Sequence, residues 1–192
     1  MPKPRGRDMK KLAAVLTFAV LIPCMAHAQT TVEIGSGIGA AINFENGSTL
    51  TQIGVPGPGA GVYGLLGQAP LYASFFVGDG MMIQPEVAFN LLTGEGSTLT
   101  SLVSSLHLGY AFAGAGVSSP YVTVNGGVQW LDSNDSSSET NWGIGGRVGY
   151  RLVVNQGFAT SFEAGYRRWL SNGGYNEVVV GIRLGGILSS PK

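Results

Sequence analysis

The chain has few of the residues on which most catalytic, redox and nucleic-acid-binding sites depend. Its 192 residues include one cysteine, two histidines and only 11% charged residues. A single cysteine cannot form a disulfide within the chain. Lys and Arg together number 11, as do Asp and Glu, so no basic surplus suggests a nucleic-acid partner. Beyond the N-terminus, no apolar run approaches the roughly 20 residues that a membrane-spanning helix needs.

Residues 1–28 predict a cleaved secretory signal peptide. Five basic residues precede an apolar core at 12–22, and Ala26-His27-Ala28 matches a signal-peptidase site. A lipoprotein box ending at Cys24 is the alternative, although Pro23 fits that box poorly. Cleavage after Ala28 removes the cysteine and leaves six basic against ten acidic residues. We therefore expect a mildly acidic mature chain, residues 29–192, that folds as one domain without thiol chemistry.

Glycine and a two-residue alternation dominate the mature chain. From residue 141 onward, bulky apolar side chains such as Trp142 and Val148 alternate with glycine and with Arg147 and Arg151. Successive side chains of a β-strand point to opposite faces, so this period predicts strands. About 9–11 residues of tilted strand cross a bilayer, and several of these segments are that long. The expected strands are 31–44, 70–77, 81–91, 98–112, 120–131, 141–153, 158–167 and 177–185.

The connections between these strands alternate in character. Polar or long segments at 45–68, 93–97, 132–140 and 171–174 are expected to be loops, and short turns are expected at 78–80, 113–119 and 154–157. Outer-membrane barrels have short periplasmic turns and longer extracellular loops, so the short turns are predicted to be periplasmic. Pro85 has no backbone N–H to donate to a neighbouring strand, so we expect a local irregularity in its strand.

The alternation is compatible with two kinds of β-protein. A soluble barrel would bury the bulky face, whereas a membrane barrel turns it toward lipid and keeps glycine and paired charges inside. Glycine on the polar face, charges of both signs on that face, and aromatic residues near the strand ends all favour the membrane barrel. The fold class predicted is an all-β, eight-stranded, antiparallel up-and-down transmembrane barrel.

The signal peptide, the eight alternating strands and the segment Gln84-Pro85-Glu86 resemble the small outer-membrane β-barrel family. This family includes the transmembrane domain of outer membrane protein A, outer membrane protein X and the opacity proteins. The resemblance implies a bacterial outer-membrane protein in contact with membrane lipids and lipopolysaccharide, with the barrel assembly machinery and periplasmic chaperones as partners during biogenesis. Members usually end on an aromatic residue, whereas this chain ends Ser189-Ser190-Pro191-Lys192. The resemblance does not identify a partner for the extracellular loops.

Four inward glutamates are expected to face four inward arginines and one histidine. An eight-stranded barrel is just wide enough for side chains to fill it, and buried charges must be paired. The sequence therefore predicts a salt-bridged plug that closes the lumen; the alternative is a gated pore whose pairs rearrange. The predicted lumen residues are Glu33, Glu86, His107, Arg147, Arg151, Glu163, Arg167, Glu177 and Arg183.

Large aromatic side chains with outward phase lie at or near the strand ends, where a membrane barrel meets the lipid–water interfaces. Arg168 also has outward phase, near the external end of its strand, where it contacts lipid phosphate or is merely solvated. The predicted aromatic girdle comprises Tyr110, Phe112, Trp130, Trp142, Tyr150, Phe158 and Tyr166.

No enzymatic, cofactor or metal site is predicted. Some small barrels act on lipid A through a His–Ser pair on the lipid-facing surface, but His107 has inward phase, and Ser101 and Ser105 are expected to lie too far along the strand to contact it. Asp132, Asp135 and Glu139 do not have the spacing of a calcium-binding loop, so we expect a solvated acidic loop.

Overall fold

The computed structural model describes residues 31–45, 48–54, 70–94, 97–133, 136–171 and 174–188. The predicted signal peptide and the last four residues lie outside this part of the chain. Among the described residues, no helix is long and apolar enough to cross a membrane. The strands are β1 (Thr31–Glu45), β2 (Ser48–Gly54), β3 (Leu71–Val77), β4 (Met81–Gly94), β5 (Ser97–Ala111), β6 (Ser119–Ser133), β7 (Ser136–Asn155), β8 (Phe158–Trp169) and β9 (Asn176–Leu188).

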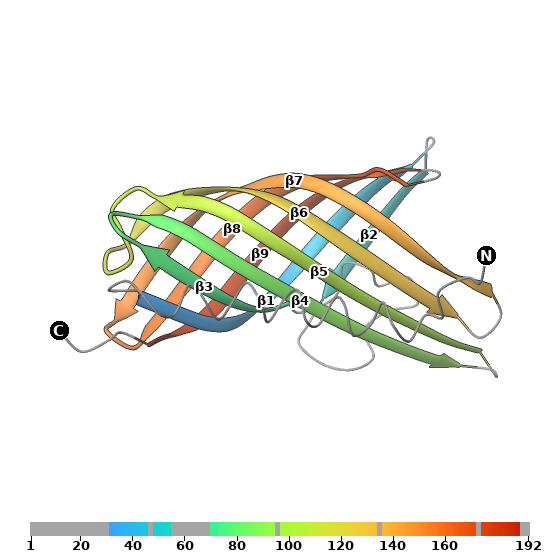
Figure 1. Cartoon of the computed structure of the whole chain (residues 1–192), viewed down its shortest axis with the longest axis horizontal. Coiled ribbons are helices and arrows are strands. Elements are labelled where there is room, and N and C mark those ends of the chain that lie inside the picture. The colour runs from blue at the N-terminus through green and yellow to red at the C-terminus, as the bar shows by residue number, and fades with distance from the viewer. Residues whose placement is uncertain are drawn as a thin grey trace, which may run out of the picture.

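The strands form one antiparallel sheet that closes on itself (Figure 1). Each strand from β3 to β9 pairs with the next, and β9 closes the barrel by pairing with β1 along residues 32–44. The segments β2 and β3 pair with the same edge of β1, at its two ends, so nine segments occupy eight positions around the barrel. The predicted eight-stranded antiparallel barrel is confirmed.

Three predicted loops are wrong in part, because the strands run further than the apolar pattern. Residues 48–54 were expected to be loop but form β2, while 55–68 lie outside the described residues. At 93–97, pairing continues to Gly94↔Ser97, and at 132–140 it continues to Ser133↔Ser136. Backbone hydrogen bonds do not depend on side-chain polarity, so a ladder can continue past the end of an apolar pattern.

The turn between β3 and β4 needs glycine. Gly78 and Gly80 have φ values of 59° and 135°, which L side chains rarely adopt. A Cβ on Gly80 would also meet the carbonyl oxygen of Ala111, whose N–H donates to Gly80 O at 2.8 Å. These contacts confirm the predicted tight turn at 78–80.

Pro85 produces the expected irregularity on one side only. Its strand β4 pairs with β5 without interruption through Pro85↔Leu106. On the other side, the ladder with β3 stops between Tyr72↔Glu86 and Phe75↔Ile83 and resumes in the same register. A residue without an N–H can sit in a ladder where no donor is required of it, and this accounts for the asymmetry.

The apolar face of the alternation points outward and the charged face points inward. Val148, Phe162 and Ile182 are 59%, 52% and 44% exposed, while their neighbours Glu163 and Arg183 lie in the interior. Soluble monomers rarely expose a contiguous apolar patch larger than a few hundred Å². The exposed apolar belt is therefore typical of a barrel surrounded by lipid.

Candidate functional site: the barrel lumen

Four side chains form a closed ring of alternating charge in the middle of the lumen. Glu86 accepts hydrogen bonds from Arg147 Nη1 at 2.9 Å and from Arg183 Nη2 at 2.7 Å. Glu163 Oε1 lies 3.4 Å from Arg147 Nη1, and Glu163 Oε2 lies 2.8 Å from Arg183 Nε. The last contact lacks hydrogen-bond alignment and is a charge contact. We call Glu86, Arg147, Glu163 and Arg183 the ion-pair ring.

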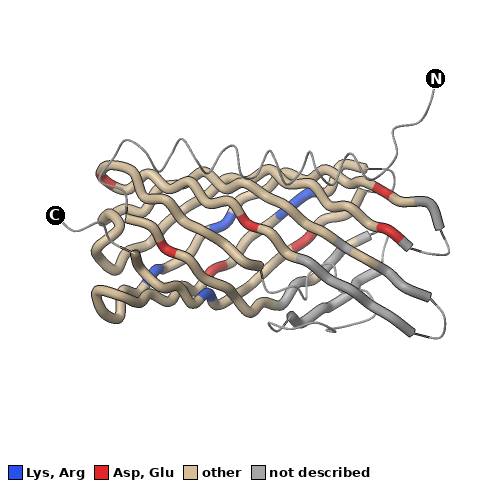
Figure 2. Tube along the Cα trace, turned by 60° about the horizontal axis from the view of Figure 1, so that its bottom comes forward, with Lys and Arg blue, Asp and Glu red and all other residues tan. Residues whose placement is uncertain are grey.

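The ion-pair ring spans the lumen rather than following its wall. Glu86 comes from β4, whereas the other three members of the ring come from β7, β8 and β9, on the other side of the barrel. Figure 2 shows positions of both signs gathered in the middle of the barrel. Two positive and two negative charges balance, so the ring leaves no unpaired charge in a low-dielectric interior.

A second ion pair lies on the side of the ring toward the 78–80 turn. Arg151 Nε donates to Glu33 Oε2 at 2.7 Å, and both side chains are 3% exposed. Tyr72 donates its hydroxyl to the other oxygen of Glu33, and Arg151 lies 4.9 Å over the ring of Phe76. Arg151 also donates to the carbonyl oxygen of Ala115 at 2.6 Å. An apolar cluster around Phe76 fills the lumen between this ion pair and the end of the barrel. It comprises Phe76, Met82, Ala111 and Tyr121, with Ala115 packed against it.

The opposite side of the ring holds Arg167 and Glu177, which face each other in the register of β8 and β9. Arg167 donates to Asn125 Oδ1 at 3.3 Å and stacks 5.2 Å from the ring of Trp169. Glu177 accepts a 2.8 Å hydrogen bond from the indole N–H of Trp169. Trp169 is 1% exposed and closes this side of the lumen with Ala88, Val103 and Tyr175.

Sequence reasoning missed three aromatic residues that complete these contacts. Tyr72 donates to Glu33, Tyr121 donates to Glu163 Oε2 at 2.8 Å, and Trp169 donates to Glu177. Their strand phase was the available signal, because Tyr121 shares the parity of inward Thr123 and Trp169 shares that of Arg167. The sequence predicts a role for aromatic residues in the outer girdle alone.

The expectation that Ser105 lies too far from His107 is wrong. Ser105 Oγ lies 3.3 Å from His107 Nε2, and the same nitrogen lies 3.5 Å from Glu86 Oε2. Side chains at i and i+2 share a face of a strand, and these two are long enough to meet across the pleat. The cluster is inside the barrel, with His107 fully buried and Ser105 5% exposed. The Ser105–His107 pair therefore does not point toward the membrane, where a lipid substrate would lie.

Two small cavities lie on the two sides of the ion-pair ring. One, of about 60 Å³, is lined by Glu86, Arg147 and Arg167, and the other, of about 10 Å³, by Glu33 and Tyr72. Arg183 lines both, because its side chain stands between them. These volumes hold a few water molecules at most. Side chains, rather than a water column, occupy most of this lumen.

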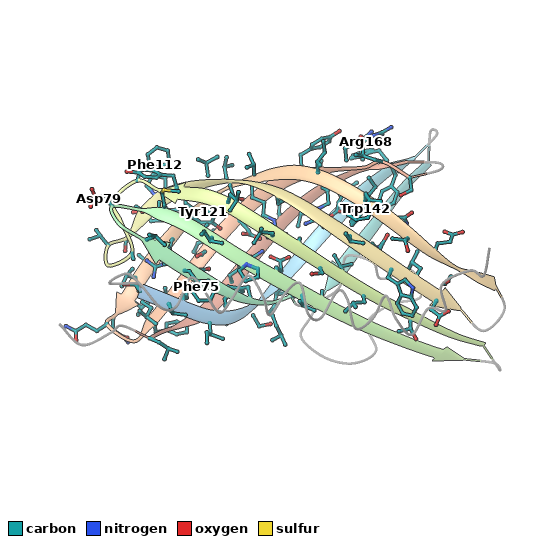
Figure 3. The ribbon with its side chains drawn as sticks, in the orientation of Figure 1. Phe75, Asp79, Phe112, Tyr121, Trp142 and Arg168 are labelled. Carbon is teal, nitrogen blue, oxygen red and sulfur yellow. The ribbon has the colours of Figure 1, made fainter. Side chains whose placement is uncertain are left out.

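Six of the seven predicted girdle residues lie in strands with outward register, and Phe112 directly follows β5; all are 37–62% exposed except Trp130, which is half-buried. Figure 3 places Phe112 at the end of the barrel that carries the 78–80 turn, and Trp142 and Arg168 toward the opposite end. The aromatic side chains thus lie toward both ends of the exposed apolar belt, with Tyr110 and Phe112 in edge-to-face contact at 5.6 Å.

Among the described residues, no three His, Cys, Asp or Glu side chains gather closely enough to hold a metal ion. Asp135 of the predicted acidic loop lies outside that part of the chain. Asp132 lies in β6 and Glu139 in β7, so both belong to strands rather than to a loop.

No protein-family model and no curated protein matches the sequence. The fold is similar to that of Ail, the attachment invasion locus protein of Yersinia pestis, solved with the heparin analogue sucrose octasulfate: TM-score 0.53, 12% identity, covering 83% of this chain and 99% of Ail. It is also similar to Neisserial surface protein A, with a TM-score of 0.51, 13% identity, and coverage of 82% and 97%. At 12–13% sequence identity, the similarity to these two proteins shows the fold alone.

Proposed function

Since this chain has the fold of small eight-stranded outer-membrane barrels, we propose that it is an integral protein of the bacterial outer membrane with a closed, non-conducting lumen. Residues 1–28 direct its export and are removed, and residues 29–192 form the barrel. Its role is to support the envelope or to present its loops at the surface. It has no catalytic activity and needs no cofactor.

The ion-pair ring carries the proposal of a closed lumen. A pore needs a continuous path for water, whereas Glu86 and its two arginines cross the lumen, and in the described part of the chain the cavities on either side of them are small. Removing one partner of a buried ion pair costs about 3–5 kcal/mol, because the other charge is left uncompensated. Opening the ring would leave these charges unpaired inside the barrel, so the closed arrangement is the more stable one.

Planar-bilayer recording tests the closed lumen. We expect no steady single-channel conductance from the folded wild-type protein. Arg183→Ala, which removes the side chain between the two cavities, serves as the comparison. Steady conductance from the wild type would favour the gated pore instead.

Membrane fractionation tests the location. The mature protein should fractionate with the outer membrane, and unboiled samples should migrate differently from boiled ones on a denaturing gel, because closed barrels resist detergent until heated. Recovery as a soluble protein with a single gel mobility would contradict the proposal. Lipopolysaccharide, outer-membrane lipids, periplasmic chaperones and the assembly machinery are its proposed partners.

A lipid A-modifying enzyme is the remaining alternative. Its only structural support is the Ser105–His107 contact, which lies in the lumen and not on the lipid-facing surface. An unchanged lipid A profile in a strain that overproduces the protein is expected. A profile that changes with wild-type protein and not with His107→Ala would establish the enzyme.

A further inference from the structure

We propose that the outer surface of β6–β9 holds one phosphorylated, acylated lipid, with its phosphate on Arg168 and an acyl chain in the groove above Gly126. This inference rests on the proposed membrane location. It begins from charge: among the described residues, five arginines are present, and Arg147, Arg151, Arg167 and Arg183 all lie in the lumen. Arg168 is exposed on the outer face.

Arg168 lies at the depth of a headgroup. It follows Phe158, the first residue of β8 and a member of the girdle, by ten residues. At about 3.4 Å per residue and a tilt of 40–45°, ten residues rise about 25 Å along the membrane normal. The apolar band of such barrels is about 25 Å tall. If Phe158 lies at one interface, Arg168 lies at the other.

The guanidinium of Arg168 is held in place at one edge. Its Nη1 donates to Asn176 Oδ1 at 2.9 Å, and Tyr166 donates its hydroxyl to the same oxygen at 2.7 Å. A guanidinium has five N–H donors in a planar fork that matches phosphate geometry. Asn176 thus positions Arg168 while occupying one of these donors, and the exposed side chain offers the others to an anion.

An apolar groove lies next to this cation: Arg168 is not part of the lining, but its ladder partner Ile144 and the nearby Leu170 are. Leu106, Gly126, Ile144 and Arg168 are successive partners across β5, β6, β7 and β8, and all four have outward register. Gly126 has no side chain, so a groove of about 480 Å³ opens there, and Leu106, Ile144 and Trp142 line it. This volume is within the range of small-molecule sites.

The groove runs from hydrocarbon depth toward the interface. Gly126 lies seven residues beyond Ser119, the first residue of β6, whereas Arg168 lies ten residues beyond the first residue of β8. The row of partners therefore rises toward Arg168 as it crosses the strands. Trp142, 62% exposed, lies at the upper part of the groove, at the same end of the barrel as Arg168 (Figure 3).

The interfacial arginine and the apolar groove together define the chemistry of the ligand. A phosphate alone would not use an apolar groove, and an uncharged lipid would not use an interfacial arginine. A lipid with a phosphorylated headgroup and acyl chains matches both features, and such a lipid of the outer leaflet reaches this end of the barrel in the predicted orientation. The outer surface has a second groove, floored by Ala164 among Val148, Phe162 and Val180, which has no cation beside it in the described part of the chain.

Native mass spectrometry of the folded, mature protein in detergent micelles, titrated with diphosphorylated lipid A, tests the proposal. We expect one high-affinity lipid per protein. Arg168→Gln should weaken it about tenfold, the value of one charge-assisted contact with phosphate. Gly126→Leu should weaken it comparably by filling the groove, without strain, since a Cβ on Gly126 meets nothing within 4 Å. Ala164→Leu, which fills the second groove, is the matched control and should bind like the wild type.

Dephosphorylated lipid A should bind the wild type about as weakly as lipid A binds Arg168→Gln, and inorganic phosphate should not compete. Equal binding by wild type and Arg168→Gln would overturn the phosphate contact. Loss in Arg168→Gln but not in Gly126→Leu, or competition by inorganic phosphate, would overturn the acylated ligand. Heat-modifiable gel mobility of every variant shows that the barrel is folded, so failure of the wild type to insert into membranes at all counts against the proposed function and not against this site.

Discussion

Arg151 Nε lies 2.7 Å from Glu33 Oε2, although the two side chains come from β7 and β1, which are not neighbours in the barrel. Both are 3% exposed, so removing one leaves an uncompensated charge in the lumen. We expect Arg151→Met to lower the free energy of unfolding by about 3–5 kcal/mol. Urea unfolding in lipid vesicles, followed by tryptophan fluorescence, measures this difference.

The double variant Arg151→Met with Glu33→Gln is the control for that prediction. It removes both charges, so it should recover part of the loss. A double variant as unstable as the sum of the two single variants would show that the contact carries no coupling energy.

Arg147 contacts both carboxylates of the ion-pair ring. Arg147→Ala leaves Glu86 and Glu163 with Arg183 as their remaining ring partner, and we expect a loss of about 3–5 kcal/mol. The temperature at which the folded gel band disappears should fall accordingly. Glu139→Gln, at an exposed carboxylate in β7, is the matched control and should change stability by less than about 0.5 kcal/mol. If the folded gel band of Arg147→Ala disappeared at the same temperature as that of the wild type, the ion-pair ring would not contribute to stability.

Gly149 and Gly126 should respond oppositely to a methyl group. A Cβ on Gly149 would lie 2.5–2.6 Å from ring atoms of Tyr121, the tyrosine that donates to Glu163. Gly149→Ala should therefore destabilise the barrel by about 1–3 kcal/mol through overpacking. Gly126→Ala meets open space and should be neutral or slightly stabilising, because alanine loses less backbone entropy on folding. Identical unfolding curves for the two variants would contradict the inward register of Gly149.

The chain has three tryptophans, Trp130, Trp142 and Trp169. Variants that keep only Trp142 or only Trp169 can be reconstituted in vesicles of brominated lipid. Trp142, 62% exposed on the outer face, should be strongly quenched, whereas Trp169, 1% exposed in the lumen, should not. Quenching of Trp169 alone would mean that the faces are reversed.

The alternation of side chains was sufficient to predict the barrel, because a period of two fixes which residues share a face. It gave an inward phase to Glu86, His107, Arg147, Glu163 and Arg183, and the lumen brings these five side chains together. It could not assign partners, because contacts across a lumen depend on strand order and stagger rather than on neighbouring sequence.

Strand ends and side-chain reach were less predictable. Polarity suggested loops where β2, β6 and β7 continue, because hydrated strand ends need no apolar face. The Ser105–His107 contact was missed because strand spacing alone does not say how far two side chains lean toward each other. Trp169 was missed because its indole N–H makes it useful inside a polar lumen, where it reaches Glu177.

The order of the strands in the barrel gives the ion-pair ring a further meaning. Arg183 belongs to β9, the last strand in the described part of the chain, and β9 also closes the sheet against β1. Before β9 pairs, the two glutamates of the ion-pair ring share the one guanidinium of Arg147, and the ring holds a surplus negative charge. Closing the barrel and cancelling that surplus charge are thus the same event. A sheet that lacks β9 is therefore both open at its edge and unbalanced in its ring.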